Sequence, residues 1–125
     1  MPHIVVEVSP PLLASIQWAP ALRALHLELF ERGWARLEDL KSRVTPITAE
    51  LCGEDVHAQQ LIATLTLTNQ RPPDISAGMK QLVFDHMSRA VEDCSEAFGW
   101  VQCCVFLQER SKTQYLKRQW NAPCG

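Results

Sequence analysis

The sequence predicts one α+β domain: a four-stranded mixed sheet with two helices on one of its faces. Two rounds of strand, helix and strand follow one another along the chain, an order typical of a small layered fold. The chain has 125 residues, of which 46% are hydrophobic, so it has the size of a single domain and can bury one core. We therefore expect residues 1–125 to form one domain, with a partly irregular tail over about residues 109–125.

The first round begins with a β-branched run. Residues 3–8, HIVVEV, predict a strand, and the proline-rich residues 9–20 predict a connection without regular structure. Leucines at helical spacing predict a helix over residues 19–32, and Gly33 is the kind of residue that ends one. A second strand is expected over residues 37–44, followed by a loop.

The second round has the more regular patterns. Residues 60–68 alternate apolar with mostly polar side chains, which predicts a half-buried strand. Asp74 is a suitable N-cap for a helix whose apolar face recurs up to residue 98, and Gly99 is expected to end that helix. Residues 100–108 predict the last strand, so the second round repeats the first.

Two of the predicted strands are apolar on both sides. In the first, Ile4 and Val6 alternate with Val5, and in the last, Val105 is followed by Phe106. Helices on one face leave the other face of the sheet uncovered, and an exposed apolar face of that size is expected to be buried by a partner. A symmetric homo-oligomer is the simplest such partner.

Charge and hydropathy argue against two classes of partner. Twelve basic and fourteen acidic side chains give a net charge of −2 without a basic run, whereas nucleic-acid binding needs a concentrated positive field. The apolar stretches are too short to cross a membrane, and the N-terminus lacks the pattern of a signal peptide. We therefore expect a soluble cytoplasmic protein that binds neither nucleic acid nor membranes.

The five cysteines indicate reduced thiols rather than a metal site. Their number is odd, and no C-x-x-C pair gives the spacing of a zinc site. Cys103 and Cys104 are neighbours, so on a strand they point to opposite faces and do not grip one ion together. Glycine-rich phosphate loops and H-E-x-x-H motifs are also missing, so we expect no metal and no cofactor. The cysteines are Cys52, Cys94, Cys103, Cys104 and Cys124.

Proline directly follows Met1 and opens the first predicted strand. One interpretation is structural: Pro2 lacks a backbone N–H, and the first residue of a strand is one of its few tolerated places in a sheet. The other interpretation is chemical. If Met1 is removed, Pro2 becomes an N-terminal secondary amine, a titratable group fixed at the end of a strand. The residues alone leave both interpretations open.

Several short motifs resemble one protein family. The chain begins M-P-H and its first strand ends V-E-V-S; K-S-R stands at residues 41–43, L-T-L at residues 65–67 and L-K-R at residues 116–118. Together with a first helix that carries His26, these motifs resemble the 5-carboxymethyl-2-hydroxymuconate delta-isomerase family of the tautomerase superfamily. The resemblance spans nearly the whole chain, with K-S-R where the family often has R-S-R.

This resemblance implies a fold, an assembly and a reaction. It implies a homotrimer of β-α-β repeats that works without a cofactor. In such a protein the N-terminal proline, freed of methionine, moves a proton between carbons of an unsaturated keto or hydroxy dicarboxylic acid in the catabolism of aromatic compounds. Burial and neighbouring cations lower the pKa of an α-amino group toward the working pH, where a general base is most effective.

The implied substrate carries several carboxylates, so the resemblance also implies a cationic site. Arginine holds a carboxylate bidentately, while lysine offers a point charge. A family arginine just before the second helix falls on Pro73 here, and Arg71, two residues earlier, is available in its place. The candidate substrate-binding residues are Lys41, Arg43, Arg71, Lys117 and Arg118, with Pro2 as the candidate catalytic residue.

Two functions from different classes remain. The first is a cofactor-free isomerase with Pro2 as general base and acid. The second is a non-catalytic trimeric module on the same scaffold that binds small acids, in which Pro2 only begins a strand. The two differ in a simple observable, because a retained Met1 would block the amine of Pro2.

Overall fold

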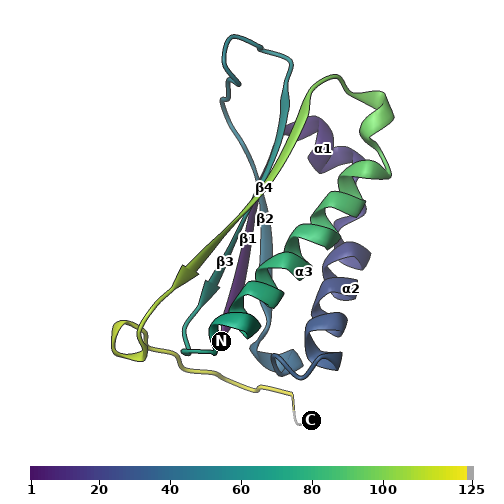
Figure 1. The fold of residues 1–125 in the computed structure, drawn as a ribbon. Helices are drawn as coiled ribbons and strands as arrows, with labels where there is room; N and C mark the ends of the chain where they lie inside the picture. The colour runs from purple at the N-terminus through teal and green to yellow at the C-terminus, as the bar shows by residue number, and fades with distance from the viewer. Residues whose placement is uncertain (124–125) are drawn as a thin grey trace.

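The computed structural model describes residues 1–123 and confirms the predicted four-stranded mixed sheet. Its strands and main helices are β1 (Pro2–Val8), α1 (Pro10–Ser15), α2 (Trp18–Glu31), β2 (Lys41–Pro46), β3 (Gln59–Leu67), α3 (Pro73–Glu92) and β4 (Val101–Glu109). The order across the sheet is β2-β1-β3-β4, so the first strand of each round lies in the middle. The helices lie on one side of the sheet, as predicted (Figure 1).

Strand β1 is paired on both sides along nearly its full length. It runs parallel to β2, with His3 opposite Lys41, and antiparallel to β3, with Pro2 opposite Leu67. Strand β4 runs parallel to β3 and forms the other edge of the sheet. Each parallel pair is joined through a long helix, so the fold consists of two β-α-β units side by side (Figure 1).

The hydrophobic core fills the space between the sheet and the helices. Alternate residues of β1 and β3 are buried there, because successive side chains of a strand point to opposite faces. Helix α3 presents Met79, Val83 and Met87 to this core at the spacing of one helical face. Helix α2 adds Leu25 and Leu29. The predicted apolar stripes of both helices are therefore the buried ones.

The other face of the sheet carries no helix within residues 1–123 (Figure 1). In the register of the sheet Val5 and Phe106 both pair with Thr64, and directly paired side chains share a face. Ile62 and Cys104 form another pair on the same face. The apolar side chains of this face are Val5, Ile62, Cys104 and Phe106. Phe106 is 56% exposed. In a single chain this apolar surface, which we call the open face, is accessible to solvent.

The expectation of an unstructured connection over residues 9–20 is wrong, because this stretch contains helix α1 and the start of α2. Helix α1 begins with two consecutive prolines, Pro10 and Pro11. The fixed φ of proline suits the first turn of a helix, where its missing N–H needs no partner. Leu12 in this short helix is fully buried in the core, and this packing holds α1 in place.

The second strand begins later than predicted. Leu37–Asp39 form a 3-10 turn, and β2 starts at Lys41 and continues to Pro46. Pairing with β1 determines this start, because the first parallel pair joins His3 to Lys41. The loop expected from residue 45 therefore begins only after Pro46.

Both ends of α3 also differ from the prediction. Pro72 occupies the N-cap position, and Asp74 lies inside the first turn, where its carboxylate still favours the positive end of the helix dipole. The helix ends at Glu92, and a 3-10 turn over Ser95–Ala97 follows it. Gly99 therefore lies well beyond the helix end.

After β4 the tail crosses the end of the sheet at which β1 begins (Figure 1). A 3-10 turn over Lys112–Gln114 redirects the chain there. The ring of Tyr115 then meets the ring of His3 edge to face, with centroids 6.0 Å apart. The tail is irregular, as predicted, but it is packed against the first strand.

Two further expectations concern thiols and membranes. Cys52, Cys94, Cys103 and Cys104 are free thiols, while Cys124 lies outside the described residues. Burial raises the pKa of the Cys103 thiol to about 11, which disfavours a reactive thiolate. No helix within residues 1–123 is long and apolar enough to cross a membrane.

Candidate active site

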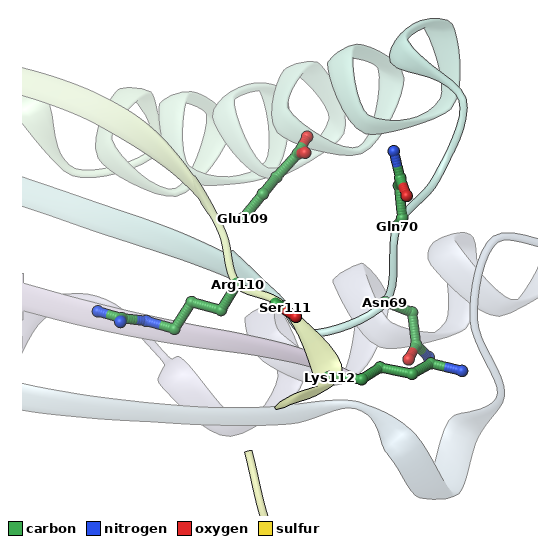
Figure 2. Close-up of a pocket in the computed structure, with 6 residues that line it drawn as sticks. All are labelled: Asn69, Gln70, Glu109, Arg110, Ser111 and Lys112. Atoms are coloured by element: carbon green, nitrogen blue, oxygen red, sulfur yellow. The ribbon is translucent and has the colours of Figure 1, made fainter. Parts of the chain in front are cut away.

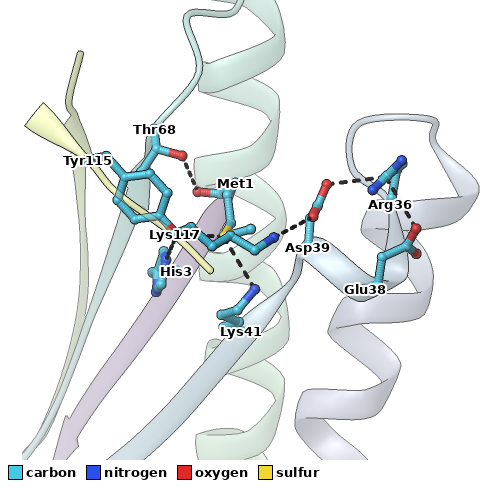
Figure 3. A network of polar contacts seen from close by, with 9 residues as sticks. All are labelled: Met1, His3, Arg36, Glu38, Asp39, Lys41, Thr68, Tyr115 and Lys117. Carbon is cyan, nitrogen blue, oxygen red and sulfur yellow. Dashed lines mark hydrogen bonds and ion pairs between the residues drawn. The ribbon is translucent and has the colours of Figure 1, made fainter. Parts of the chain in front are cut away.

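The topology gathers distant segments at the end of the sheet where β1 begins. Strand β2 runs parallel to β1 and starts at this end, whereas β3 is antiparallel to β1 and finishes there together with β4. Lys41 opens β2, Thr68 follows β3, and the tail with Tyr115 follows β4. Figure 3 shows these side chains around Met1.

Met1 is only 7% exposed, and its polar atoms have partners. The hydroxyl of Thr68 donates a hydrogen bond to the carbonyl oxygen of Met1 at 3.1 Å. The ammonium of Lys41 donates to the sulfur at 3.3 Å, and the hydroxyl of Tyr115 donates to it at 2.8 Å (Figure 3). Asn69, with its amide oxygen oriented toward the amine, accepts a hydrogen bond from the Met1 nitrogen at 3.2 Å.

The amine of Met1 lies in a cationic environment. Burial is the largest cause that lowers its pKa, and the charges of Arg71, Lys117 and Lys41 lower it further, against the opposing charge of Asp39. Burial and the charge of Lys117 also lower the pKa of the Lys41 ammonium. This end of the sheet therefore favours a neutral amine and places three cations close to it.

Asp39 connects the tail with the segment that precedes β2. One of its carboxylate oxygens lies 3.4 Å from the ammonium of Lys117, and the other lies 3.3 Å from Nε of Arg36 (Figure 3). Burial alone would raise the pKa of Asp39, but the hydrogen bonds and charges of these two cations outweigh burial and lower it. Asp39 is therefore ionised near neutral pH, and it orients Lys117.

Arg71 lies in the connection between β3 and α3, and its side chain extends toward the residues that follow α2. Its guanidinium donates to the carbonyl oxygen of Asn69 at 3.3 Å and to that of Trp34 at 3.4 Å. Together with Arg36 and Asp39 it lines a hollow of about 410 Å³. A guanidinium has five N–H donors, so these two backbone contacts leave donors for a carboxylate.

His3 and Arg43 belong to the open face of the sheet. Burial lowers the pKa of His3, and the charges of Arg43 and Lys41 lower it further. Nε2 of His3 lies 3.5 Å from the hydroxyl of Tyr115. His3 is therefore mostly neutral at pH 7 and supports the ring of Tyr115.

Four of the six predicted site residues meet at the start of β1. Pro2 is the first residue of this strand and is buried on the helix side of the sheet, opposite in direction to His3. The three cations among them are those whose charges lower the pKa of the amine. Arg43, two residues further along β2, is not among the charges that lower the pKa of the amine, although its charge lowers the pKa of His3. The four residues are Pro2, Lys41, Arg71 and Lys117.

Arg118 does not join this group. Its guanidinium carbon lies 5.9 Å from the ring centroid of Trp120, on the exposed part of the tail. Conversely, the structure brings in residues that no motif marked, because single polar residues after a strand or in a tail are common. The pairing of β1 with its neighbours and the path of the tail bring them to the start of β1. These residues are Asp39, Thr68, Asn69 and Tyr115.

A larger hollow of about 590 Å³ lies between the end of β3 and the start of the tail. The side chains of Arg110 and Lys112 extend in opposite directions there (Figure 2). We place the candidate site at Met1, because the titratable amine and the cations that lower its pKa are there. The larger hollow is adjacent to this site, since Asn69 lines both it and the hollow beside Arg71. The larger hollow is lined by Asn69, Gln70, Glu109, Arg110, Ser111 and Lys112. Within residues 1–123 no group of three His, Cys, Asp or Glu side chains could hold a metal ion.

No protein-family model matches the chain, and no curated protein matches it. Solved structures match it in fold. One is a 5-carboxymethyl-2-hydroxymuconate isomerase from Deinococcus radiodurans R1, with a TM-score of 0.80 and 14% identity over 94% of this chain and 88% of that one. Another is a 5-carboxymethyl-2-hydroxymuconate delta-isomerase, with a TM-score of 0.72 and 11% identity over 97% of this chain and 89% of that one.

A third match is a fused wild-type 4-OT, solved as a symmetric trimer. Its TM-score is 0.63 and its identity 15%, over 89% of this chain and 87% of that one. At such identities the likeness concerns the fold, and it agrees with the family that the sequence motifs resemble. The protein has the tautomerase fold of the 5-carboxymethyl-2-hydroxymuconate isomerases.

Proposed function

We propose that the protein is a cofactor-free isomerase. In this proposal it moves a proton between carbons of an unsaturated keto or hydroxy dicarboxylic acid, of the 5-carboxymethyl-2-hydroxymuconate type, in aromatic-compound catabolism. Pro2, freed of Met1, is its general base and acid. The observation that carries the proposal is the position of the Met1 amine, partly buried at the start of β1 with Arg71, Lys117 and Lys41 around it.

The chemistry requires an amine that is neutral at pH 7. An ordinary α-amino group titrates near 8, and the surroundings of Met1 lower the pKa of an amine at this end of β1. A neutral Pro2 takes a proton from a carbon next to the substrate's carbonyl group, and the electron pair of that C–H bond moves into a dienolate. The resulting ammonium returns the proton further along the conjugated chain, so the reaction is balanced without a co-reactant.

The cations have two roles in this proposal. The guanidinium of Arg71 holds a substrate carboxylate with the donors that its backbone contacts leave free. Lys41 and Lys117 have the second role: they hold the carboxylate next to the reacting carbon, because both ammonium groups lie close enough to the amine for their charges to lower its pKa. Arg43 is a candidate for a more distant carboxylate, whereas the position of Arg118 gives it no such role.

We also propose a cytoplasmic homotrimer. The open face with Val5, Ile62 and Phe106 supports an assembly, since an isolated chain would leave this apolar surface in water. The fused 4-OT structure of similar fold is a symmetric trimer. A trimer of this chain would bury the open face without leaving a further copy of it exposed.

One observation favours the alternative, a small-acid-binding module without catalysis. Met1 fits into the structure with partners for its oxygen, sulfur and nitrogen, and a peptide bond to Met1 leaves Pro2 without a free amine. In a module of this kind Pro2 acts only as the first residue of β1, for which its missing N–H suits it.

An assay of enol-to-keto conversion of 2-hydroxydienoates, followed by ultraviolet absorbance, distinguishes the two functions. The isomerase should convert the substrate, and Pro2→Ala should keep the fold and reduce kcat by up to roughly 10²–10⁴, the contribution of a positioned acid–base group. The binding module should bind the acid without turnover. Turnover that is unchanged in Pro2→Ala would show that another group is the base.

A further inference from the structure

Met1 occupies a compartment whose walls are hydrogen-bond donors. The hydroxyl of Thr68 donates to its carbonyl oxygen, and the hydroxyl of Tyr115 and the ammonium of Lys41 both donate to its sulfur. The residue is almost fully enclosed, and the amine of the same residue contacts Asn69. The first residue thus has, in one buried place, the contacts that a small polar ligand would need.

Removal of Met1 would leave these donors without their acceptors. Thr68 is 4% exposed with Met1 in place, and loss of Met1 leaves its hydroxyl free to donate to another oxygen, since buried polar groups are almost always hydrogen-bonded. The ring of Tyr115 also packs edge to face against His3, a contact that does not involve Met1. The vacated volume is therefore a compartment with donors already directed into it.

We propose that this compartment, formed by Thr68, Tyr115 and Lys41, is an oxygen-binding subsite that becomes available when Met1 is removed and that recognises 2-keto acids. This inference rests on the proposed function, since it uses the same excision of Met1. The subsite adds Thr68 and Tyr115 to the residues that select the substrate.

The contacts of Met1 indicate which ligand oxygen each donor takes. The Met1 carbonyl carbon is bonded to the nitrogen of Pro2, so the oxygen held by Thr68 lies next to the future amine. Thr68 therefore takes the keto or enol oxygen nearest the reacting carbon. The sulfur lies further from Pro2, at the end of the side chain, where Tyr115 and Lys41 converge. This pair, one neutral donor and one cation, takes the adjacent carboxylate.

The test uses 2-oxoadipate, a saturated 2-keto dicarboxylate without the conjugated double bonds that the proposed isomerisation requires, as a calorimetric probe. Protein that begins at Pro2, shown by its mass, should bind the probe. Protein that retains Met1 should bind it at least tenfold more weakly, because the methionine fills the compartment. Thr68→Val and Tyr115→Phe, each in Pro2-first protein, should weaken binding about tenfold, since each removes one hydrogen bond to a charged or polarised oxygen. Thr48→Val, an exposed threonine in the loop after β2, is the matched control and should bind normally.

Equal affinity of Met1-retaining and Pro2-first protein would overturn the subsite, as would unchanged affinity in Thr68→Val and Tyr115→Phe, or no binding of the probe at all. The same variants separate this inference from the proposed function. Probe binding that depends on Thr68 and Tyr115, without any isomerase turnover, would support the subsite and contradict the proposed catalysis. Turnover with an unchanged KM in Thr68→Val and Tyr115→Phe would support the proposed catalysis and contradict the subsite.

Discussion

The ammonium of Lys117 lies 3.4 Å from a carboxylate oxygen of Asp39, and this ion pair joins the tail to the segment before β2. The ion pair holds Lys117 close enough to the Met1 amine for the charge of Lys117 to lower the pKa of that amine. The next residue, Arg118, lies near Trp120 instead. Two adjacent cations therefore have different surroundings, and they provide a matched pair of variants.

Lys117→Ala should raise the KM for a dicarboxylate substrate about tenfold, because a hydrogen bond to a charged group contributes about 1.5–3 kcal/mol and 1.4 kcal/mol is a factor of ten. Arg118→Ala should change the KM by less than about twofold, as expected for an exposed cation. Steady-state kinetics of both variants, with circular dichroism to verify the fold, checks this difference. Similar KM values for the two variants would contradict the placement of Lys117 in the site.

Stability should fall as the pH is lowered through the range just below 6.5. Burial lowers the pKa of both His3 and His26 in the folded chain, while the unfolded chain keeps the ordinary histidine value of about 6.5. The unfolded state then binds more protons, so the stabilisation is present above pH 6.5 and is lost as the pH falls toward the folded pKa values.

Urea unfolding at pH 7.5, 6.5 and 5.5 measures this dependence. His26→Gln should flatten it, since the variant removes one of the two groups, whose Nε2 lies 2.6 Å from the hydroxyl of Ser42. His57→Gln makes the same chemical change at an exposed histidine in the loop before β3 and serves as the control variant. A wild-type slope in His26→Gln would rule out His26 as a source of the pH dependence.

Leu65→Ala should destabilise the protein by about 2–5 kcal/mol, because it opens a cavity at a fully buried position of β3. Leu116→Ala makes the same chemical change at a side chain that is 99% exposed, and it should alter the free energy of unfolding by less than about 0.5 kcal/mol. Chemical denaturation of both variants compares them directly. Equal destabilisation would mean that Leu116 is covered in solution.

The sequence predicts the fold well where one pattern has one structural solution. The alternation over residues 60–68 gives the buried face of β3, and Gly33 follows α2 with a φ of 74°, the left-handed conformation that glycine adopts readily. Prediction fails where a residue has two uses. Pro10 and Pro11 suggest a break in structure, but proline also suits a first helical turn, and the packing of Leu12 decides between the two.

The site is less predictable than the fold because it depends on strand pairing. Lys41 is visible in the sequence as a cation of the second predicted strand, and Arg71 as a cation just before the second predicted helix. Thr68 and Tyr115 are ordinary polar residues until the antiparallel pairing of β1 with β3 and the path of the tail place them at Met1. No local pattern encodes that register, so sequence reasoning alone does not find them.

Phe106→Glu should dissociate the assembly that we propose. A charge in the middle of a buried apolar interface is unfavourable, and Phe106 lies on the open face of β4. Size-exclusion chromatography with light scattering should give about three times the chain mass of 14.1 kDa for the natural sequence and one chain mass for the variant. Phe84→Glu, on α3 at the other side of the sheet, is the control. A variant that stays trimeric would move the interface away from the open face.

The most direct test of the account compares isomerase turnover by two forms of the same chain, one that begins at Pro2 and one that retains Met1, each verified by its mass. The second form can be produced with methionine aminopeptidase inhibited. We predict that the Pro2-first form is active, with a rate that rises with pH through an apparent pKa below the ordinary α-amino value of about 8, and that the Met1-retaining form is folded but nearly inactive. Full turnover by protein whose mass shows an intact Met1 would contradict the central claim that the amine of Pro2 is the base.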